Sequence, residues 1–280
     1  MIAGPAARRL RMRARPGSAR RAWAALCLGL ALAGSAAQAG ERCGTDRSAR
    51  LGIAEGSLVR LGEAAAAYED LTARYGHGVL GDALEPETLR FWSLELPDRC
   101  GTAVTLDPLH VFEDLAPRLA DLDGDNRPEA ITVRSHRSKG AQIAVYGLRA
   151  GRLTLIAQTP YIGRSNRWLA PIGAADLDGD GHVEIAYIDR PHLAKTLRIW
   201  RFKDGKLSEA ASAPGLTNHR IGQDFLTSGI RDCGQGPELV TVSGGWRRIM
   251  ASRLKDGEIS TRDIGRFRPE TGLQDALACR

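Results

Sequence analysis

The sequence predicts an all-β protein, a β-propeller of about four to five four-stranded blades with an irregular N-terminal segment. Two observations predict it. An acidic motif occurs twice, beginning at Asp121 and again at Asp176, 55 residues later, and each copy is followed by short apolar stretches separated by glycine turns. Repeats of this length with four short antiparallel strands are typical of propeller blades. We expect repeats near residues 117–170, 171–226 and 227–268.

The first 39 residues have the pattern of an export signal. They hold seven Arg and no acidic residue, and they include an apolar run over 22–34 and small residues up to Ala39. This pattern predicts a signal peptide cleaved between Ala39 and Gly40. A pair of arginines before the apolar run leaves twin-arginine export open beside the general route. We therefore expect a periplasmic or secreted protein, with a single domain over residues 40–280 and no membrane span.

Loss of the leader changes the charge of the chain. The formal net charge of +6 comes from 39 basic and 33 acidic residues, and seven of the basic residues lie in the leader. The mature part then has 32 basic residues against 33 acidic ones, a net charge near −1. A near-neutral domain is not expected to bind nucleic acid.

Four cysteines remain after the leader, in a compartment where disulfides persist. They are Cys43, Cys100, Cys233 and Cys279, and three pairings are open. We favour the pairing local in sequence, which joins Cys43 to Cys100 and Cys233 to Cys279.

Each acidic motif precedes an apolar, β-branched stretch that predicts a strand. Glycine-containing turns follow, and Asp-Gly between apolar runs is a strong hairpin signal. The predicted strands include 130–133, 185–188 and 239–242, and the predicted turns lie at 150–151, 204–205 and 256–257. Upstream, segments between residues 84 and 115 are expected to supply another blade. The alanine-rich stretch 64–75 favours a helix by propensity.

The two acidic motifs are DLDGDNRPE at 121–129, here the first acidic loop, and DLDGDGHVE at 176–184, the second acidic loop. Their carboxylates fall at positions 1, 3, 5 and 9, and hard oxygen ligands that converge in this way suit calcium. The predicted ligands are Asp121, Asp123, Asp125, Glu129 and the carbonyl of Arg127 in the first loop, and Asp176, Asp178, Asp180, Glu184 and the carbonyl of His182 in the second.

An EF-hand is the main competing interpretation of these loops. It requires a bidentate Glu at position 12, where this chain has Thr132 and Tyr187 in apolar strands. We therefore exclude it. A third copy, 231–238, replaces ligand positions with Arg231, Cys233 and Gln235. Here a disulfide would fasten the turn that calcium no longer holds.

On these motifs the chain resembles the FG-GAP/VCBS repeat proteins, which include the propeller of integrin α-subunits. The resemblance covers roughly residues 110–265. It implies a propeller used mainly for binding, in which each acidic loop joins the first two strands of a blade and holds a calcium ion. It implies two calcium sites in this chain, with a structural role.

Because strands alternate in direction, a second group of polar residues should lie on the face opposite the acidic loops. Cationic, amide and aromatic side chains gathered there would suit an anionic small ligand or a macromolecule. The predicted binding residues are Asn166, Arg167, Trp168, His136, Lys139, His192, Lys195, Asn218, His219 and Arg220. The bland alternative is that they are solvated loop residues, with Trp168 buried between blades.

No catalytic motif is present in the sequence: it has no nucleophile elbow, no zinc-protease helix signature and no phosphate-binding glycine loop. The six His lack the spacing of a metal site. The function expected is therefore an exported, calcium-stabilised binding module. The alternative is a hydrolase or lyase acting on sugars or phosphoesters, with a site on the face opposite the acidic loops, for example His192 with Asp189 and Lys195.

Overall fold

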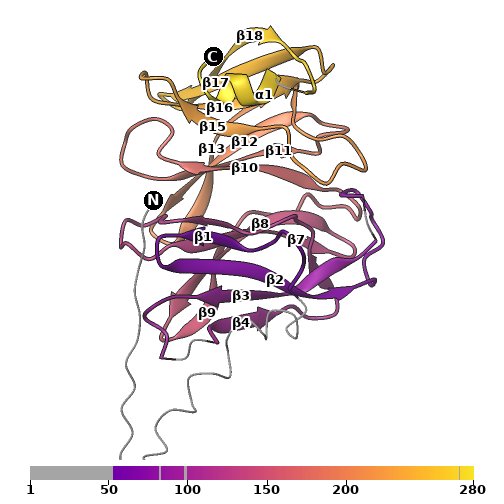
Figure 1. The fold of residues 1–280 in the computed structure, drawn as a ribbon, viewed down its shortest axis with the longest axis vertical. Helices are drawn as coiled ribbons and strands as arrows, with labels where there is room; N and C mark the ends of the chain where they lie inside the picture. Colours follow the sequence, from indigo (N-terminus) through magenta and orange to yellow (C-terminus); the bar gives the residue numbers. More distant parts are fainter. Residues whose placement is uncertain (1–52, 82, 98–99, 271) are drawn as a thin grey trace, which may run out of the picture. The chain divides into compact units, whose positions relative to one another are not determined.

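A computed structural model describes residues 53–81, 83–97, 100–270 and 272–280. The expected signal peptide and Cys43 lie outside the described residues. The described chain is all-β, as predicted, with four antiparallel sheets and one short helix, α1 (Gly272–Leu277) (Figure 1). Within this part of the chain no helix is long and apolar enough to cross a membrane.

Each sheet is built from strands that follow one another in sequence. The first holds β1 (Val59–Leu61), β2 (Ala64–Thr72), β3 (Glu85–Trp92) and β4 (Thr102–Thr105). The second holds β5 (His110–Phe112), β6 (Arg118–Ala120), β7 (Glu129–His136), β8 (Gly140–Arg149) and β9 (Arg152–Gln158). The third holds β10 (Leu169–Ala175), β11 (Glu184–Asp189), β12 (Thr196–Lys203) and β13 (Lys206–Pro214). The fourth holds β14 (Leu216–Thr217), β15 (Gly229–Asp232), β16 (Pro237–Ser243), β17 (Arg248–Lys255) and β18 (Glu258–Arg266).

Tight hairpins join the last two strands of the last three sheets, at the turns expected from the sequence. The first turn residue has a positive φ in each: 50° at Ala150, 50° at Asp204 and 52° at Asp256. Glycine follows each of them, also with positive φ. Turns with two such residues match the twist of the strands they connect, which is why glycine-containing pairs mark them.

The prediction of helix for the stretch 64–75 is wrong, because most of it forms strand β2. Its first six residues, from Ala64 to Glu69, are all buried, so both faces of the strand are covered. A helix would expose part of this run to water. Packing on both faces therefore outweighs the helix propensity of alanine, whose small side chain allows close approach of neighbouring elements.

Apolar cores join neighbouring sheets. Tyr68 of the first sheet stacks on Phe112 of the second at 5.1 Å between ring centroids. A second core includes Val145 of the second sheet and Ile185 of the third. A third core includes Ile188 of the third sheet and Leu239 of the fourth. The helix α1 packs on the fourth sheet through Ala276 and its neighbours.

The loop between β2 and β3 reaches beyond its own sheet. Val79 and Leu80 are buried in the core shared by the second and third sheets. The carbonyl of Val79 also accepts a hydrogen bond from the amide of Gly222, 3.1 Å away, in the connection between β14 and β15. A loop of the first sheet thus contacts a connection within the fourth sheet. Four sheets agree with the expected blade number.

Candidate functional site

The first acidic loop joins β6 to β7 in the second sheet, and the second acidic loop joins β10 to β11 in the third. In the first acidic loop the Asp121 carboxylate accepts hydrogen bonds from the amides of Gly124 (2.8 Å) and Asn126 (2.9 Å). Gly124 has a φ of +76°, which glycine adopts without strain and which this tight turn requires. The second acidic loop repeats the arrangement, with Asp176 accepting from Gly179 and Gly181.

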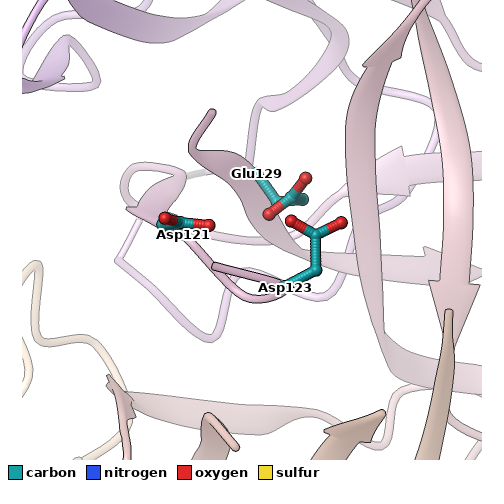
Figure 2. Close-up of side chains that lie close together, drawn as sticks. All are labelled: Asp121, Asp123 and Glu129. Carbon is teal, nitrogen blue, oxygen red and sulfur yellow. The ribbon is translucent and has the colours of Figure 1, made fainter. Parts of the chain in front are cut away.

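Three carboxylates converge in each loop. The side-chain oxygens of Asp121, Asp123 and Glu129 lie within 4.8 Å of one another, and Figure 2 shows the three groups directed toward a common space. Asp176, Asp178 and Glu184 form the matching cluster of the second loop. An all-oxygen set of this kind fits a hard cation such as Ca²⁺.

The remaining predicted ligands are placed at the edges of the two clusters. Asp125 and Asp180 lie outside the converging sets and instead accept hydrogen bonds from the amides two residues later. Those amides belong to Arg127 and His182, whose carbonyls were the predicted backbone ligands. Their role as ligands stays a prediction.

The glutamate that ends each motif is buried at the start of a strand. Glu129 is 1% exposed, and burial raises the pKa of its carboxyl to about 7. It accepts a hydrogen bond from the Leu122 amide at 3.0 Å, but no cationic side chain of the described residues forms an ion pair with it. A buried carboxylate without a counter-ion is costly when charged, so a bound cation would stabilise it.

The second loop differs because a cation of the chain itself contacts it. The guanidinium of Arg201, on β12, pairs with Glu184 at 2.6 Å and with Asp180 at 3.1 Å, and it also pairs with Asp178. Burial raises the pKa of Glu184, and the hydrogen bond from Arg201 opposes that shift. One oxygen of Asp178 remains buried without a hydrogen-bond partner.

The third copy of the motif is held without an acidic cluster. Asp232 accepts hydrogen bonds from three successive amides of the turn, and Cys233 forms a disulfide with Cys279, as predicted. The predicted pairing of Cys100 with Cys43 stays a prediction, because Cys43 lies outside the described residues. Disulfide and Asp232 together fasten this turn to the C-terminal segment.

A cavity of about 170 Å³ lies on the side opposite the acidic loops, and we call it the histidine pocket. Strand β11 connects the two places, because it begins at Glu184 in the second acidic loop and ends at Asp189 beside the pocket. Loops from all four sheets, or the connections between them, contribute to its walls. They supply His77, Asn166, Arg167, Trp168, Arg190, Pro191, His192, Leu193 and Ile221.

Four of the ten predicted binding residues line this pocket: Asn166, Arg167, Trp168 and His192. Sequence reasoning missed His77 and Arg190. Arg190 lies in the same hairpin as His192, so its position in that turn was a usable signal. His77 offered none, because its loop carries no motif and reaches the pocket only through the long β2–β3 connection.

A buried carboxylate orients His77. Glu113 is fully buried; its side chain contacts Nδ1 of His77 and accepts a hydrogen bond from the hydroxyl of Ser135. Its backbone carbonyl accepts a hydrogen bond of 2.8 Å from Nε1 of Trp168. Glu113 therefore fixes one wall of the pocket and sets the orientation of its imidazole.

A second pair of imidazoles lies beside it. Nε2 of His192 lies 3.0 Å from Nδ1 of His219, whose Nε2 faces the carbonyl of Gln223 at 2.9 Å. Burial, with His219 and His77 nearby, lowers the pKa of His192 to about 4. Burial also lowers the pKa of His219. Trp168, 2% exposed, packs on both rings. The rings of His192 and His219 are therefore neutral near pH 7 and pack against Trp168.

The other predicted binding residues are placed elsewhere on this side. His136 packs against His110 and Tyr161, and Lys139 lies over the Tyr161 ring. Lys195 donates to the carbonyl of Gly244 at 2.7 Å.

Asn218 is buried and donates to Ala170 and Ser228. Arg220 is exposed and lies over the Trp246 ring at 4.3 Å. These residues, with Lys195, serve packing or turn structure rather than the pocket wall.

Comparison with known families and structures bears on the acidic loops. Residues 121–187 match the FG-GAP-like repeat, a segment that contains both loops and the strands between them. No curated protein matches the sequence.

Two solved structures resemble the chain in fold. A protein from Lactobacillus plantarum has 12% identity and a TM-score of 0.44, over 78% of this chain and 56% of that one. The exotype rhamnogalacturonan lyase YesX has 14% identity and a TM-score of 0.36, over 76% of this chain and 50% of that one. The chain spans about half the length of these two structures.

Proposed function

We propose that this FG-GAP-like repeat protein is an exported, calcium-stabilised binding module that takes an anionic ligand, or the anionic part of a macromolecule, in the histidine pocket. The observation that carries the proposal is the composition of that pocket. Two arginines, an amide and two histidines meet in a hollow built by loops of several sheets. Convergent polar groups in a preformed concavity are the usual mark of a ligand site.

The two arginines have different roles in this proposal. Arg190 holds both oxygens of Asp189 at 2.8 and 2.9 Å, so its charge is already matched. Arg167 forms no ion pair with any described residue, and its Nη1 donates to the carbonyl of Asn166 at 2.9 Å. The unmatched guanidinium of Arg167 is therefore the group that would bind a carboxylate or phosphate, through paired hydrogen bonds.

The size of the pocket limits what enters it. A volume of about 170 Å³ is below that of sites for drug-sized molecules, so we expect a single anionic group or sugar unit of a larger ligand to enter. A uronate-bearing oligosaccharide meets these requirements, because it carries a carboxylate on a compact ring.

Calcium has a structural part in the proposal. When bound at an acidic loop it would neutralise the converging carboxylates and stiffen the turn between two strands. The residues of the histidine pocket, at the other end of β11, would bind the ligand. The ion itself would take no part in recognition.

One observation favours a second candidate, a lyase or hydrolase acting at the same pocket. The buried carboxylate of Glu113 against Nδ1 of His77 is an arrangement that orients an imidazole as a general base. Its Nε2 would accept a proton from the bound sugar or from water. This differs from the site expected from the sequence, which centred on His192.

The test is a titration of the protein with uronate-bearing oligosaccharides and with the same oligosaccharides after reduction of their carboxyl groups. We expect binding of the acidic set, and a loss of roughly tenfold or more in affinity for Arg167→Ala. Arg137→Ala is the matched control, since Arg137 is an exposed arginine outside the pocket. Both variants should melt as the parent does.

Mass analysis of the bound oligosaccharides separates the two candidates. A binding module leaves them intact, whereas an enzyme shortens them and loses this turnover in His77→Ala. Equal affinity for acidic and reduced forms, or an Arg167→Ala variant that binds like the parent, would overturn the proposed pocket.

A further inference from the structure

The residue opposite the motif's glutamate differs among the three copies. In the third sheet Glu184 pairs across the ladder with Arg201. In the second sheet Ala130 pairs with Tyr146, so one step further along this register Gly147 lies opposite Glu129. In the fourth sheet Leu239 pairs with Ser252, which places Arg253 opposite Glu238. Cross-strand neighbours are close enough to interact directly.

Arg201 uses this position to reach across the second acidic loop. Its guanidinium contacts Glu184, Asp180 and Asp178, and two of these three also belong to the converging cluster. An incoming cation must compete with this group for the same oxygens. The unpartnered oxygen of Asp178 shows that Arg201 satisfies the loop only in part.

The first acidic loop lacks such a group. Gly147 has no side chain, and a Cβ placed there would lie 3.4 Å from Oε1 of Glu129. Arg149, two residues further along β8, donates to the carbonyl of Leu148 at 3.0 Å, and its one ion pair among the described residues is with Asp123, at 3.6 Å; its side chain is 44% exposed. A pair that open to water contributes little.

In the third copy of the motif, several arginines pair with the glutamate. Glu238 is paired with Arg231, Arg253 and Arg262. Arg231 itself stands at the first position of the motif, where the other copies have aspartate. In this copy arginines of the chain alone match the charge of the buried glutamate.

We propose that Arg201 is a built-in counter-ion, so that the two acidic loops fill at different calcium concentrations, the first loop tightly and the second weakly. The inference rests on the proposed role of calcium and refines it. In place of two equal sites, the chain has one site that depends on the ion and one that the protein partly satisfies by itself.

Substitution of the residues that lie opposite the two glutamates, Gly147 and Arg201, tests this proposal. The measurement is a calorimetric titration of calcium into the chelator-treated protein. We expect two steps in the parent, separated by roughly tenfold or more in affinity. Asp123→Ala should remove the tight step and Asp178→Ala the weak one. Arg201→Gln should tighten the weak step, and Gly147→Arg should weaken the tight step.

The exchange is sterically reasonable. Gly147 does not have a positive φ, and the atoms nearest to an added Cβ are the terminal carbon of Ile156 at 3.1 Å and Nη1 of Arg149 at 3.3 Å, both at the ends of side chains that can shift. If Gly147→Arg fails to fold, Arg201→Gln decides alone. Two equal steps in the parent, or no change in Arg201→Gln, would overturn the inference and leave the calcium proposal standing. No calcium binding in any form would overturn both.

Discussion

At the scale of single residues, burial favours the neutral form of two imidazoles, His192 and His219. His192 has its pKa lowered to about 4 by burial and by nearby His219, His77 and Lys195, against an ordinary value of 6.5. Above pH 6.5 the ring is neutral in folded and unfolded chains alike. Between pH 6.5 and about 4 the unfolded chain takes up a proton that the folded one refuses. The contribution of His192 to the free energy of unfolding is therefore fully present above pH 6.5 and is lost as the pH falls towards 4.

This gives a measurable pH dependence. We expect the melting temperature of the parent to fall between pH 7 and pH 4.5, and to fall less in His192→Gln, which has no ring to protonate. The measurement is a set of thermal melts across this range in the absence of ligand. Identical slopes for parent and variant would show that His192 does not carry the effect.

Single residues also show the limit of sequence reasoning about the site. The acidic loops were recognisable because aspartates at alternate positions, with a glycine between them, have few other uses. His77 and Glu113 were not, since a lone His and a lone Glu 36 residues apart give no local pattern. Only the course of the β2–β3 loop brings them together.

At the scale of elements, strand β2 depends on alanine for its tight packing. Ala66 is fully buried between the first two sheets, in a core with Tyr68 and Phe91. We expect Ala66→Leu to lower the free energy of unfolding by about 1–3 kcal/mol, because the added methylenes have no space. Urea denaturation measures the loss.

Leu71→Ala on the same strand is the matched control. Its side chain is 49% exposed, so the change should stay within about 0.5 kcal/mol. Equal effects at the two positions would mean that the core around β2 is not close-packed.

Strands after the acidic loops were predictable because β-branched runs and Asp-Gly turns specify them locally. Strand β2 was not, because nothing within the run of alanines indicates that both faces of the strand will be buried, one of them against the second sheet. Its structure is a property of the sheet rather than of the segment.

At the scale of the whole molecule, one disulfide of the described chain ties the turn between β15 and β16 to the segment that follows α1. The Cys233–Cys279 disulfide closes a loop with a sequence separation of 46 residues. By the loop-entropy estimate, replacing both cysteines by alanine should lower the free energy of unfolding by about 4 kcal/mol, most of it through a less restricted unfolded chain. Urea denaturation of the double variant tests this, and a loss below about 1 kcal/mol would contradict the estimate.

The hydrogen bond between Gly222 and Val79 has a consequence for how the chain folds. Its two partners, at positions 79 and 222, are separated by 143 residues (222 − 79), and contacts between such distant segments form slowly because a long loop must close first. The β2–β3 loop therefore cannot complete its contacts until the connection between β14 and β15 has been synthesised. The wall that carries His77 is then the last part of the pocket to be assembled, and a truncated chain that lacks the final sheet would fold its early strands yet leave the pocket unfinished.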